Sequence, residues 1–247
     1  MAKKISFVNE KGGVGKTTGA REVAGILGKR KKVLLIDLDF QRNLTGSFPE
    51  LEYTNTIYDV FDSYPEPNEV IVPIKKNIDI IPGDIRLRGI DKDLFYRSQA
   101  HMILSKFLRN VEDNYDYIIF DLHPAMGEVE KNALVCSEWL LVPIEAHYFS
   151  LDGLEILEMY QEELKEELDY ELEPLIFFNR VGRGNAPLQI MEEIRDGRPN
   201  VLKTFIRDTV KIKEASMCGE FLVDYAKTSN GTKDFRSLVK ELKDYGI

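Results

Sequence analysis

The sequence predicts a single α/β domain with a doubly wound, mostly parallel sheet covered by helices on both faces. Short apolar runs alternate with segments of helical periodicity along most of the chain, which is typical of strand–helix–strand units. No repeat, low-complexity tract or change in composition marks a linker. A length of 247 residues suits one hydrophobic core, so residues 1–247 are expected to form one domain.

The first elements are a strand, a loop and a helix. Residues 4–8 are rich in β-formers, glycines follow, and residues 17–30 place apolar side chains at helical spacing. Residues 31–39 (KKVLLIDLD) predict a central buried strand, because their apolar run has no polar interruption. Residues 41–77 hold four prolines and are expected to be connecting structure with a short helix around TIYDVF.

The same alternation continues to the end of the chain. Each further apolar run is too short for a helix and is followed by a helical segment. The predicted strands are residues 78–83, 115–122, 138–145, 173–179 and 201–206. The predicted helices lie near residues 95–113, 151–168, 187–195 and 232–244.

Composition places the chain among soluble globular proteins. Hydrophobic residues make up 43% and charged residues 30%, and no apolar run is long enough to span a membrane. The first residues contain no apolar signal region, so a cytoplasmic location is expected. Cys136 and Cys218 lie in no metal-binding or redox spacing and are expected to be buried free thiols.

The segment GGVGKTT between the first strand and the first helix predicts a phosphate-binding loop. Glycines let the backbone aim its N–H groups at phosphate oxygens, and the helix N-terminus adds positive partial charge. Lys16 is expected to neutralise the β- and γ-phosphates, Thr17 to ligate Mg²⁺, and Thr18 to donate to the α-phosphate. The candidate nucleotide-binding residues are Gly12, Gly13, Val14, Gly15, Lys16, Thr17 and Thr18.

Acidic side chains follow two of the predicted buried strands. Asp37 and Asp39 end the second strand, and Asp121 ends the strand YDYIIFDL. Ligands bind beyond the carboxyl ends of strands in open α/β sheets, so these carboxylates are expected to face the phosphates. Asp37 and Asp39 are two residues apart on an extended chain and therefore project to the same side.

Three segments together resemble one known family. KGGVGKTT with its early lysine, LLIDLDFQRNLT and YDYIIFDLHPAMG are similar to the deviant Walker P-loop ATPases of the ParA/MinD superfamily, and most similar to ParA partition proteins. The resemblance covers nearly the whole chain. It implies an Mg·ATP-dependent sandwich dimer in which Lys11 reaches the phosphates held by the other subunit, as an arginine finger does.

The resemblance also suggests roles for single residues. It implies that Asp39 orients the attacking water, that Asp37 supports the magnesium shell or the switch region, and that Asp121 is the Walker B acid. Asn179 resembles the asparagine that hydrogen-bonds adenine. The implied catalytic set is Lys11, Lys16, Asp37 and Asp39, and the implied metal set is Thr17, Asp37 and Asp121.

The sequence departs from the family pattern at several positions. Phe40 and Arg42 replace a proline and a glycine, His123 replaces a proline, and His147 replaces a glutamate. The favoured interpretation is that the histidines are tolerated substitutions. If they tune the reaction instead, ATPase activity has a step near pH 6 to 7 that His123→Pro removes.

The resemblance to ParA further implies binding to non-specific DNA and hydrolysis stimulated by a ParB-like partner, which would bring the ATP state to the nucleoid. A net charge of −9 excludes a wholly basic surface, yet basic residues collect between residues 180 and 213. The candidate DNA contacts are Arg195, Arg207, Lys211 and Lys213. KRKK at 29–32 is interpreted as the solvated end of a helix. The first strand begins near residue 4, so a helix-turn-helix extension for operator binding is not expected.

Two alternatives stay open. One is a MinD-like ATPase that binds membrane through a C-terminal amphipathic helix, although the apolar face of DFRSLVKELKDYGI is about what packing on a sheet requires. The other is a nucleotide-dependent scaffold or regulator with low turnover. The complete set of Lys11, Lys16, Asp39 and Asp121 argues against the second.

Overall fold

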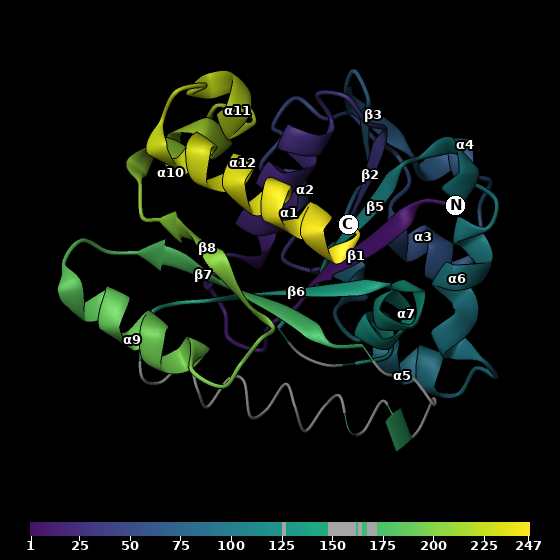
Figure 1. The fold of residues 1–247 in the computed structure, drawn as a ribbon. Coiled ribbons are helices and arrows are strands. Elements are labelled where there is room, and N and C mark those ends of the chain that lie inside the picture. The colour runs from purple at the N-terminus through teal and green to yellow at the C-terminus, as the bar shows by residue number, and fades with distance from the viewer. Residues whose placement is uncertain (125–126, 148–161, 163–164, 167–171) are drawn as a thin grey trace.

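The structure is a computed structural model that describes residues 1–124, 127–147, 162, 165–166 and 172–247. The described residues form one eight-stranded sheet in the order β3-β4-β2-β5-β1-β6-β7-β8 (Figure 1). Every neighbouring pair is parallel except β3 and β4, which are antiparallel. The strands are β1 Lys3–Phe7, β2 Val33–Asp37, β3 Val72–Lys75, β4 Ile78–Ile81, β5 Tyr117–Asp121, β6 Trp139–Ile144, β7 Pro174–Val181 and β8 Val201–Arg207.

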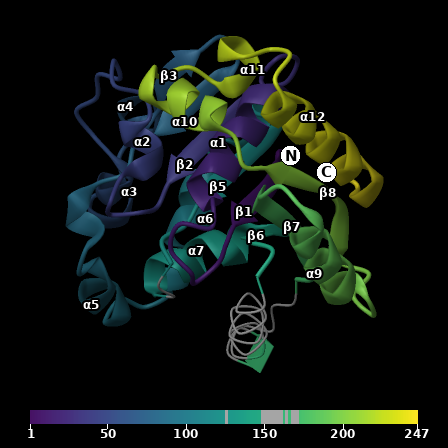
Figure 2. The same ribbon diagram turned by 90° about the vertical axis from the view of Figure 1, so that its left-hand side faces the viewer.

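Helices cover both faces of this sheet, as Figure 2 shows along its edge. One face carries α1 (Lys16–Leu27), α10 (Val210–Met217), α11 (Leu222–Tyr225) and α12 (Asn230–Leu242). The other face carries α3 (Ile57–Asp62), α5 (Ile90–Phe95), α6 (Ile103–Leu108), α7 (Glu128–Cys136) and α9 (Asn185–Arg195). Two short helices, α2 (Asn43–Gly46) and α4 (Pro67–Val70), lie in the connection between β2 and β3. The predicted α/β class and mostly parallel sheet are confirmed.

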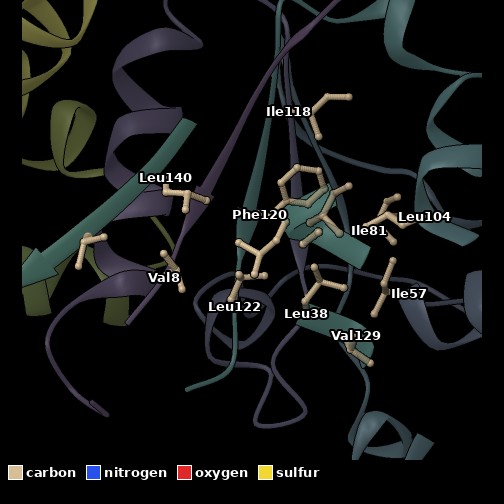
Figure 3. Close-up of a cluster of buried hydrophobic side chains, with 14 of the residues drawn as sticks. Val8, Leu38, Ile57, Ile81, Leu104, Ile118, Phe120, Leu122, Val129 and Leu140 are labelled. Carbon is tan, nitrogen blue, oxygen red and sulfur yellow. The ribbon is translucent and has the colours of Figure 1, made fainter. Parts of the chain in front are cut away.

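The central strands are apolar because both of their faces are covered. All five residues of β2 and of β5 are buried. Alternate residues of β5 serve the two faces: Ile118 and Phe120 pack toward α6 and α7, where Figure 3 shows them with Leu104 and Val129. A strand buried on both sides cannot alternate with polar residues, which explains the continuous apolar runs in the sequence.

The reversal of strand order positions the functional site. β1 lies between β5 and β6, so the chain winds toward β2 and β4 on one side and toward β7 and β8 on the other. The loop after β1 therefore emerges at the point where the two halves diverge, which is where ligands bind in open α/β sheets. Asp37 of β2 is paired in register with Asp121 of β5, which brings two of the predicted acids side by side.

Several local predictions need correction. The helix predicted near 95–113 is divided into the C-terminal residue of α5, α6 and two short 3₁₀ turns. The 41–77 connection contains β3 as well as three short helices, and α10 and α11 had no sequence prediction. β3 escaped prediction because Pro73 is unfavourable in a strand, and the structure places it at the sheet edge, where proline is tolerated. The helix predicted at 151–168 lies outside the described residues, apart from three positions.

The cysteines were only partly predicted. Cys136 at the end of α7 is largely covered, and burial raises the pKa of its thiol to about 12. Cys218 is exposed, so the prediction of a buried thiol is wrong there. Its position follows α10, where the chain turns at Gly219 instead of continuing into the core.

Helix α1 contains a buried ion pair that the sequence pattern does not predict. Arg21 is 2% exposed; its Nη1 donates to Glu22, and its Nε donates to Ser47 Oγ at 3.0 Å. The guanidinium also packs against the rings of Phe48 and Phe221, with centroids at 5.1 and 5.2 Å, and the two rings contact each other. Glu22 accepts the backbone N–H of Leu222 at 2.7 Å. The pair ties the helix behind the phosphate loop to the segments after α2 and α10.

Candidate nucleotide site

The glycine-rich loop connects β1 to α1 and is anchored by Asn9. The Asn9 side chain donates to Pro143 O of β6 at 2.9 Å and accepts the backbone N–H of Lys11 at 2.8 Å. Gly12 and Gly13 are exposed, and a Cβ added to either would meet nothing within 4 Å. The loop therefore leaves open space beside its backbone, as a phosphate cradle requires.

Gly15 is the position where only glycine fits. Its φ of 104° lies in the left-handed region, and it forms the N-cap of α1. A Cβ built there would lie 1.9 Å from Asn179 Nδ2. The Asn179 amide itself donates to Val14 O at 2.7 Å. In this structure Asn179 therefore holds the phosphate loop against β7; the implied contact with adenine stays a prediction.

Lys16 is folded back along the loop. It is 7% exposed, and its Nζ donates to Asn9 O at 2.8 Å and to Lys11 O at 3.3 Å. Burial lowers the pKa of Lys16, while the carboxylates of Asp121 and Asp39 act in the opposite direction. A cation held by backbone carbonyls beside two carboxylates is positioned to neutralise phosphate oxygens that enter the cradle.

Asp121 is the residue whose surroundings best fit a bound cation. Both carboxylate oxygens are fully buried, and neither accepts a hydrogen bond from any residue that the structure describes. Burial raises the pKa of Asp121 well above its ordinary value, and the adjacent Asp37 raises it further. The Thr17 hydroxyl and Lys16 lie near enough to oppose this effect. An unpartnered buried carboxylate is costly unless a cation or its hydration shell satisfies it.

This arrangement fits Mg²⁺ bound together with a nucleotide. Within the described ranges, no three His, Cys, Asp or Glu side chains form a metal cage by themselves. Mg²⁺ typically takes one or two protein oxygens and completes its shell with phosphates and water. Asp121 at the end of β5 and Thr17 in the first turn of α1 could supply these one or two protein oxygens.

Asp37 organises the segment that follows β2. Its Oδ2 accepts the backbone N–H of Thr45 at 2.8 Å and the Thr45 hydroxyl at 2.6 Å, and its Oδ1 accepts the Asp39 N–H at 3.1 Å. Burial raises the pKa of Asp37 to about 6 despite these bonds. Because its oxygens already have donors, this geometry favours the switch-region role over direct metal ligation.

Asp39 lies beside two of the unusual residues noted in the sequence. Its Oδ1 accepts the Gln41 N–H at 2.8 Å and is 4.0 Å from His123 Nε2. The His123 ring stacks on Phe40, with centroids 4.3 Å apart. Two separate departures from the family pattern thus form one contact next to the predicted water-orienting residue. His123 is partly buried, and this burial lowers its pKa. His147 is largely exposed.

Glu130 is a site residue that the sequence reasoning missed. It lies in the first turn of α7, is 4% exposed, and accepts the Gly127 N–H at 2.9 Å. Burial raises its pKa to about 8, and the carboxylates of Asp91 and Asp39 add to the rise. The available signal was weak: an acid three residues after the N-cap Gly127, where its carboxylate can accept the Gly127 N–H.

We expect Glu130→Gln to stabilise the nucleotide-free protein at pH 8 by about 4 kcal/mol and to change little near pH 4.5. The folded pKa lies above the unfolded one. As pH rises from about 4.5 to 8, the unfolded chain loses this proton while the folded protein keeps it, so wild type is progressively destabilised. Urea denaturation at pH 5 and pH 8 measures the difference. Glu128→Gln on the same turn is the matched control, and a less stable Glu130→Gln at pH 8 contradicts the assignment.

The remaining candidates lie farther out. The Lys11 side chain is exposed at the mouth of the site. Arg195 donates to Leu202 O at 3.0 Å and lies over the Phe178 ring, so it fastens α9 to the sheet. Arg207 pairs with Asp234, with 2.9 Å from Nε to Oδ2. Lys211 pairs with Glu214 at 2.7 Å, and Lys213 is exposed. Of the four predicted DNA contacts, Lys211 and Lys213 are the most accessible.

Comparison with known proteins places this geometry in a family. The AAA_31 family model, described as an AAA domain, matches residues 2–174. The chain is 33% identical over 256 residues to the sporulation initiation inhibitor protein Soj of Bacillus subtilis, covering 100% of both chains.

Two solved structures share the fold. One is a protein from Borrelia burgdorferi B31, described as a plasmid partition protein and bound to AMPPNP, with a TM-score of 0.87, 23% identity and coverage of 99% of this chain and 100% of that one. The other is cobyrinic acid a,c-diamide synthase from Mycobacterium smegmatis with an ATP analogue and magnesium, with a TM-score of 0.84, 22% identity and coverage of 98% and 94%.

The family model covers more than half of the chain, and the similarity to Soj extends over its full length. The cradle at the end of β1, the buried Lys16 and the unpartnered Asp121 agree with a nucleotide-hydrolysing member of such a family. The chain belongs to the ParA/Soj family of deviant Walker partition ATPases.

Proposed function

We propose that the chain is a ParA-type partition ATPase that binds Mg·ATP, closes into a homodimer, holds non-specific DNA and is reset by hydrolysis that a ParB-like partner stimulates. The observation that carries the nucleotide step is the pairing of an open glycine cradle with a buried, unpartnered Asp121 across from Lys16. Chromosomes or plasmids are the cargo that the names of its relatives suggest.

In the monomer, different residues would bind the phosphates, ligate Mg²⁺ and orient the attacking water. The backbone of Gly12 to Thr18 and the Lys16 ammonium would hold the phosphates. Mg²⁺, when bound, would neutralise charge that develops on the phosphoryl group, with Thr17 and Asp121 as its protein oxygens. Asp39 is the candidate to orient the attacking water, and the Gln41 N–H fixes its Oδ1.

Lys11 would link the nucleotide to the dimer. Its backbone N–H is held by Asn9, while its side chain is exposed, with no polar partner among the described residues. A cation in that position can reach phosphates on a facing subunit without breaking an existing contact. Delivery of charge in trans makes dimerisation and hydrolysis depend on the same nucleotide.

DNA binding is supported by a pocket of about 760 Å³ at the carboxyl ends of β7 and β8. Arg183, Arg207 and Lys211 line it, together with one acid, Asp208, and the N-caps of α9, α10 and α12. Arg183 is exposed and has no acidic partner in the part of the chain that the structure describes. Backbone N–H groups and cations together suit phosphate oxygens.

The membrane alternative loses its main argument. Phe235, Leu238, Val239 and Leu242 of α12 are all buried against α1 and the sheet, so they form core. No helix in the described ranges is long and apolar enough to cross a membrane.

Sedimentation velocity tests the proposal. We expect monomers with ADP, dimers with a non-hydrolysable ATP analogue, and co-sedimentation of random-sequence duplex DNA only with the dimer, weakening as salt rises. A dimer that does not bind DNA at low salt overturns the proposed partition function, while the assignment as an ATPase stands. Absence of nucleotide binding overturns the site itself.

A further inference from the structure

Helix α12 presents one exposed face whose charged side chains are all positive, and the exposed acid Asp244 follows directly after the last cation, just beyond the helix. Its exposed cations are spaced three, four and three residues apart, which places them on one side of a helix. They are Lys233, Arg236, Lys240 and, directly after the helix, Lys243. We call them the α12 basic face. It extends over about 15 Å of helix axis.

The two acids of α12 are turned away from this face. Asp234 pairs with Arg207 of β8. Glu241 accepts the backbone N–H groups of Lys203 and Thr204 at 2.7 and 2.8 Å. Both acids are therefore used to fasten the helix to the sheet edge. The exposed side keeps its full positive charge in a protein whose net charge is −9.

The basic face ends at a basic pocket of about 640 Å³ between α12 and the C-terminal end of α1. Leu27, Val223 and Val239 form part of its apolar floor. Six cations line it, namely Lys29, Arg30, Lys31, Lys227, Arg236 and Lys243. Three of them belong to the KRKK segment, which the sequence alone suggested to be only a solvated helix end.

Few of these cations are neutralised. Asp224, the one acid lining the pocket, pairs with Lys29 and Lys75. Lys31 pairs with Asp116 at 2.8 Å. Arg30, Lys227 and Lys243 have no acidic partner among the described residues. Favourable interaction with helix C-termini can account for Lys240 and Lys243, and for the cations just after α1 and α11, but not for Lys233 in the first turn of α12.

The position of this surface separates it from the pocket beside Arg183 and Lys211. Ser229 and Asn230, at the start of α12, line that pocket, whereas Lys243 lies past the other end of the helix. The basic pocket also adjoins Tyr117, the first residue of β5. It therefore lies at the amino ends of the strands, whereas the phosphate loop lies at their carboxyl ends. Figures 1 and 2 show α12 on the same face of the sheet as α1 and next to β8.

We propose that the α12 basic face and the basic pocket form a second contact surface for the DNA phosphate backbone, in addition to the carboxyl-edge pocket. The inference rests on the DNA binding proposed above and adds where the duplex runs. A row of cations ending in a pocket can follow successive phosphates, which carry one charge per about 1.7 Å of duplex. An anionic membrane is the less suitable occupant, because every large apolar side chain of α12 is buried and none is left to insert into lipid.

The test compares two triple variants of equal charge. Arg236→Gln, Lys240→Gln and Lys243→Gln remove part of the basic face. Lys76→Gln, Lys106→Gln and Arg109→Gln remove exposed cations around β4 and α6, away from α12. Each set takes the formal charge from −9 to −12, so general electrostatics are matched. Anisotropy of a labelled random-sequence duplex is measured with the ATP analogue at three salt concentrations, and binding to vesicles with anionic lipid is measured in parallel.

We expect the α12 variant to bind DNA about 10- to 100-fold more weakly at low salt, and its slope of log affinity against log salt to fall by about 2 to 3. The control set should stay within about twofold of wild type. Equal binding by both variants, while Arg183→Gln with Lys211→Gln reduces affinity, overturns this surface and leaves the proposed function standing. No DNA binding by wild type overturns both. Loss of vesicle binding in the α12 variant without loss of DNA binding assigns the surface to lipid and also overturns the proposal.

Discussion

Lys11→Ala should abolish dimer formation with an ATP analogue and reduce partner- or DNA-stimulated hydrolysis by roughly 10³-fold. A cation supplied in trans typically contributes 10³–10⁵ in phosphoryl transfer. The affinity of the monomer for nucleotide should change only a few-fold, because Lys16 and the loop backbone are untouched and the Lys11 side chain has no described polar contact. Sedimentation velocity and a phosphate-release assay measure the two effects.

The controls separate a specific role from loss of charge. Lys76→Ala removes an exposed lysine in the β3–β4 turn and should leave both measurements unchanged. Lys11→Arg keeps the charge and should retain part of the dimerisation. If Lys11→Ala dimerises as wild type does, the trans role is wrong and Lys11 only shapes the loop entrance.

Gly15→Ala should weaken ATP binding by roughly 30- to 150-fold. A φ of 104° is strained for any residue with a Cβ, at a cost of about 1–2 kcal/mol. The new methyl group would also overlap Asn179 Nδ2 and force that amide away from Val14 O, which costs about another 1 kcal/mol or more. Because 1.4 kcal/mol is tenfold in affinity, these terms together reach the stated range. Titration with a fluorescent ATP analogue measures it.

A second variant distinguishes the two causes. Asn179→Ala alone removes the amide that bonds Val14 O without straining Gly15, so it should weaken ATP binding by only about tenfold. Gly46→Ala is the control, because a Cβ there meets nothing within 4 Å and the backbone has no positive φ. If Asn179→Ala alone weakens binding as much as Gly15→Ala does, strain at Gly15 makes no contribution to the loss.

The fold class and the nucleotide loop could be predicted because their signals are local. Four consecutive apolar residues in β2 can be satisfied only by burial on both faces, and the structure buries all of them. A glycine cluster between a strand and a helix limits the backbone to a tight loop at the helix N-terminus. The pairing of β2 with β5 then brings Asp37 beside Asp121, as expected for acids at the ends of parallel strands.

The contacts that refine the site could not be predicted, because they join segments far apart in sequence. Asn179 lies 164 residues from Gly15, yet the two nearly touch. Phe40 and His123 look like independent substitutions until their rings are seen to stack. Glu130 and Arg21 are charged residues of a kind that usually lies on the exposed side of a helix. Only their packing in the folded chain shows that both are buried.

The sequence by itself determined the α/β class, the nucleotide loop and the acids at the strand ends, since backbone periodicity and glycine chemistry act over a few residues. Tertiary structure alone decided which charges are neutralised. Asp234 and Glu241 bind groups of β8, and Asp224 pairs with Lys29 and Lys75. The cations of the α12 basic face stay exposed. Charge pairing depends on distance in space, so the same formal charges can describe a neutral helix or a basic surface until the chain is folded.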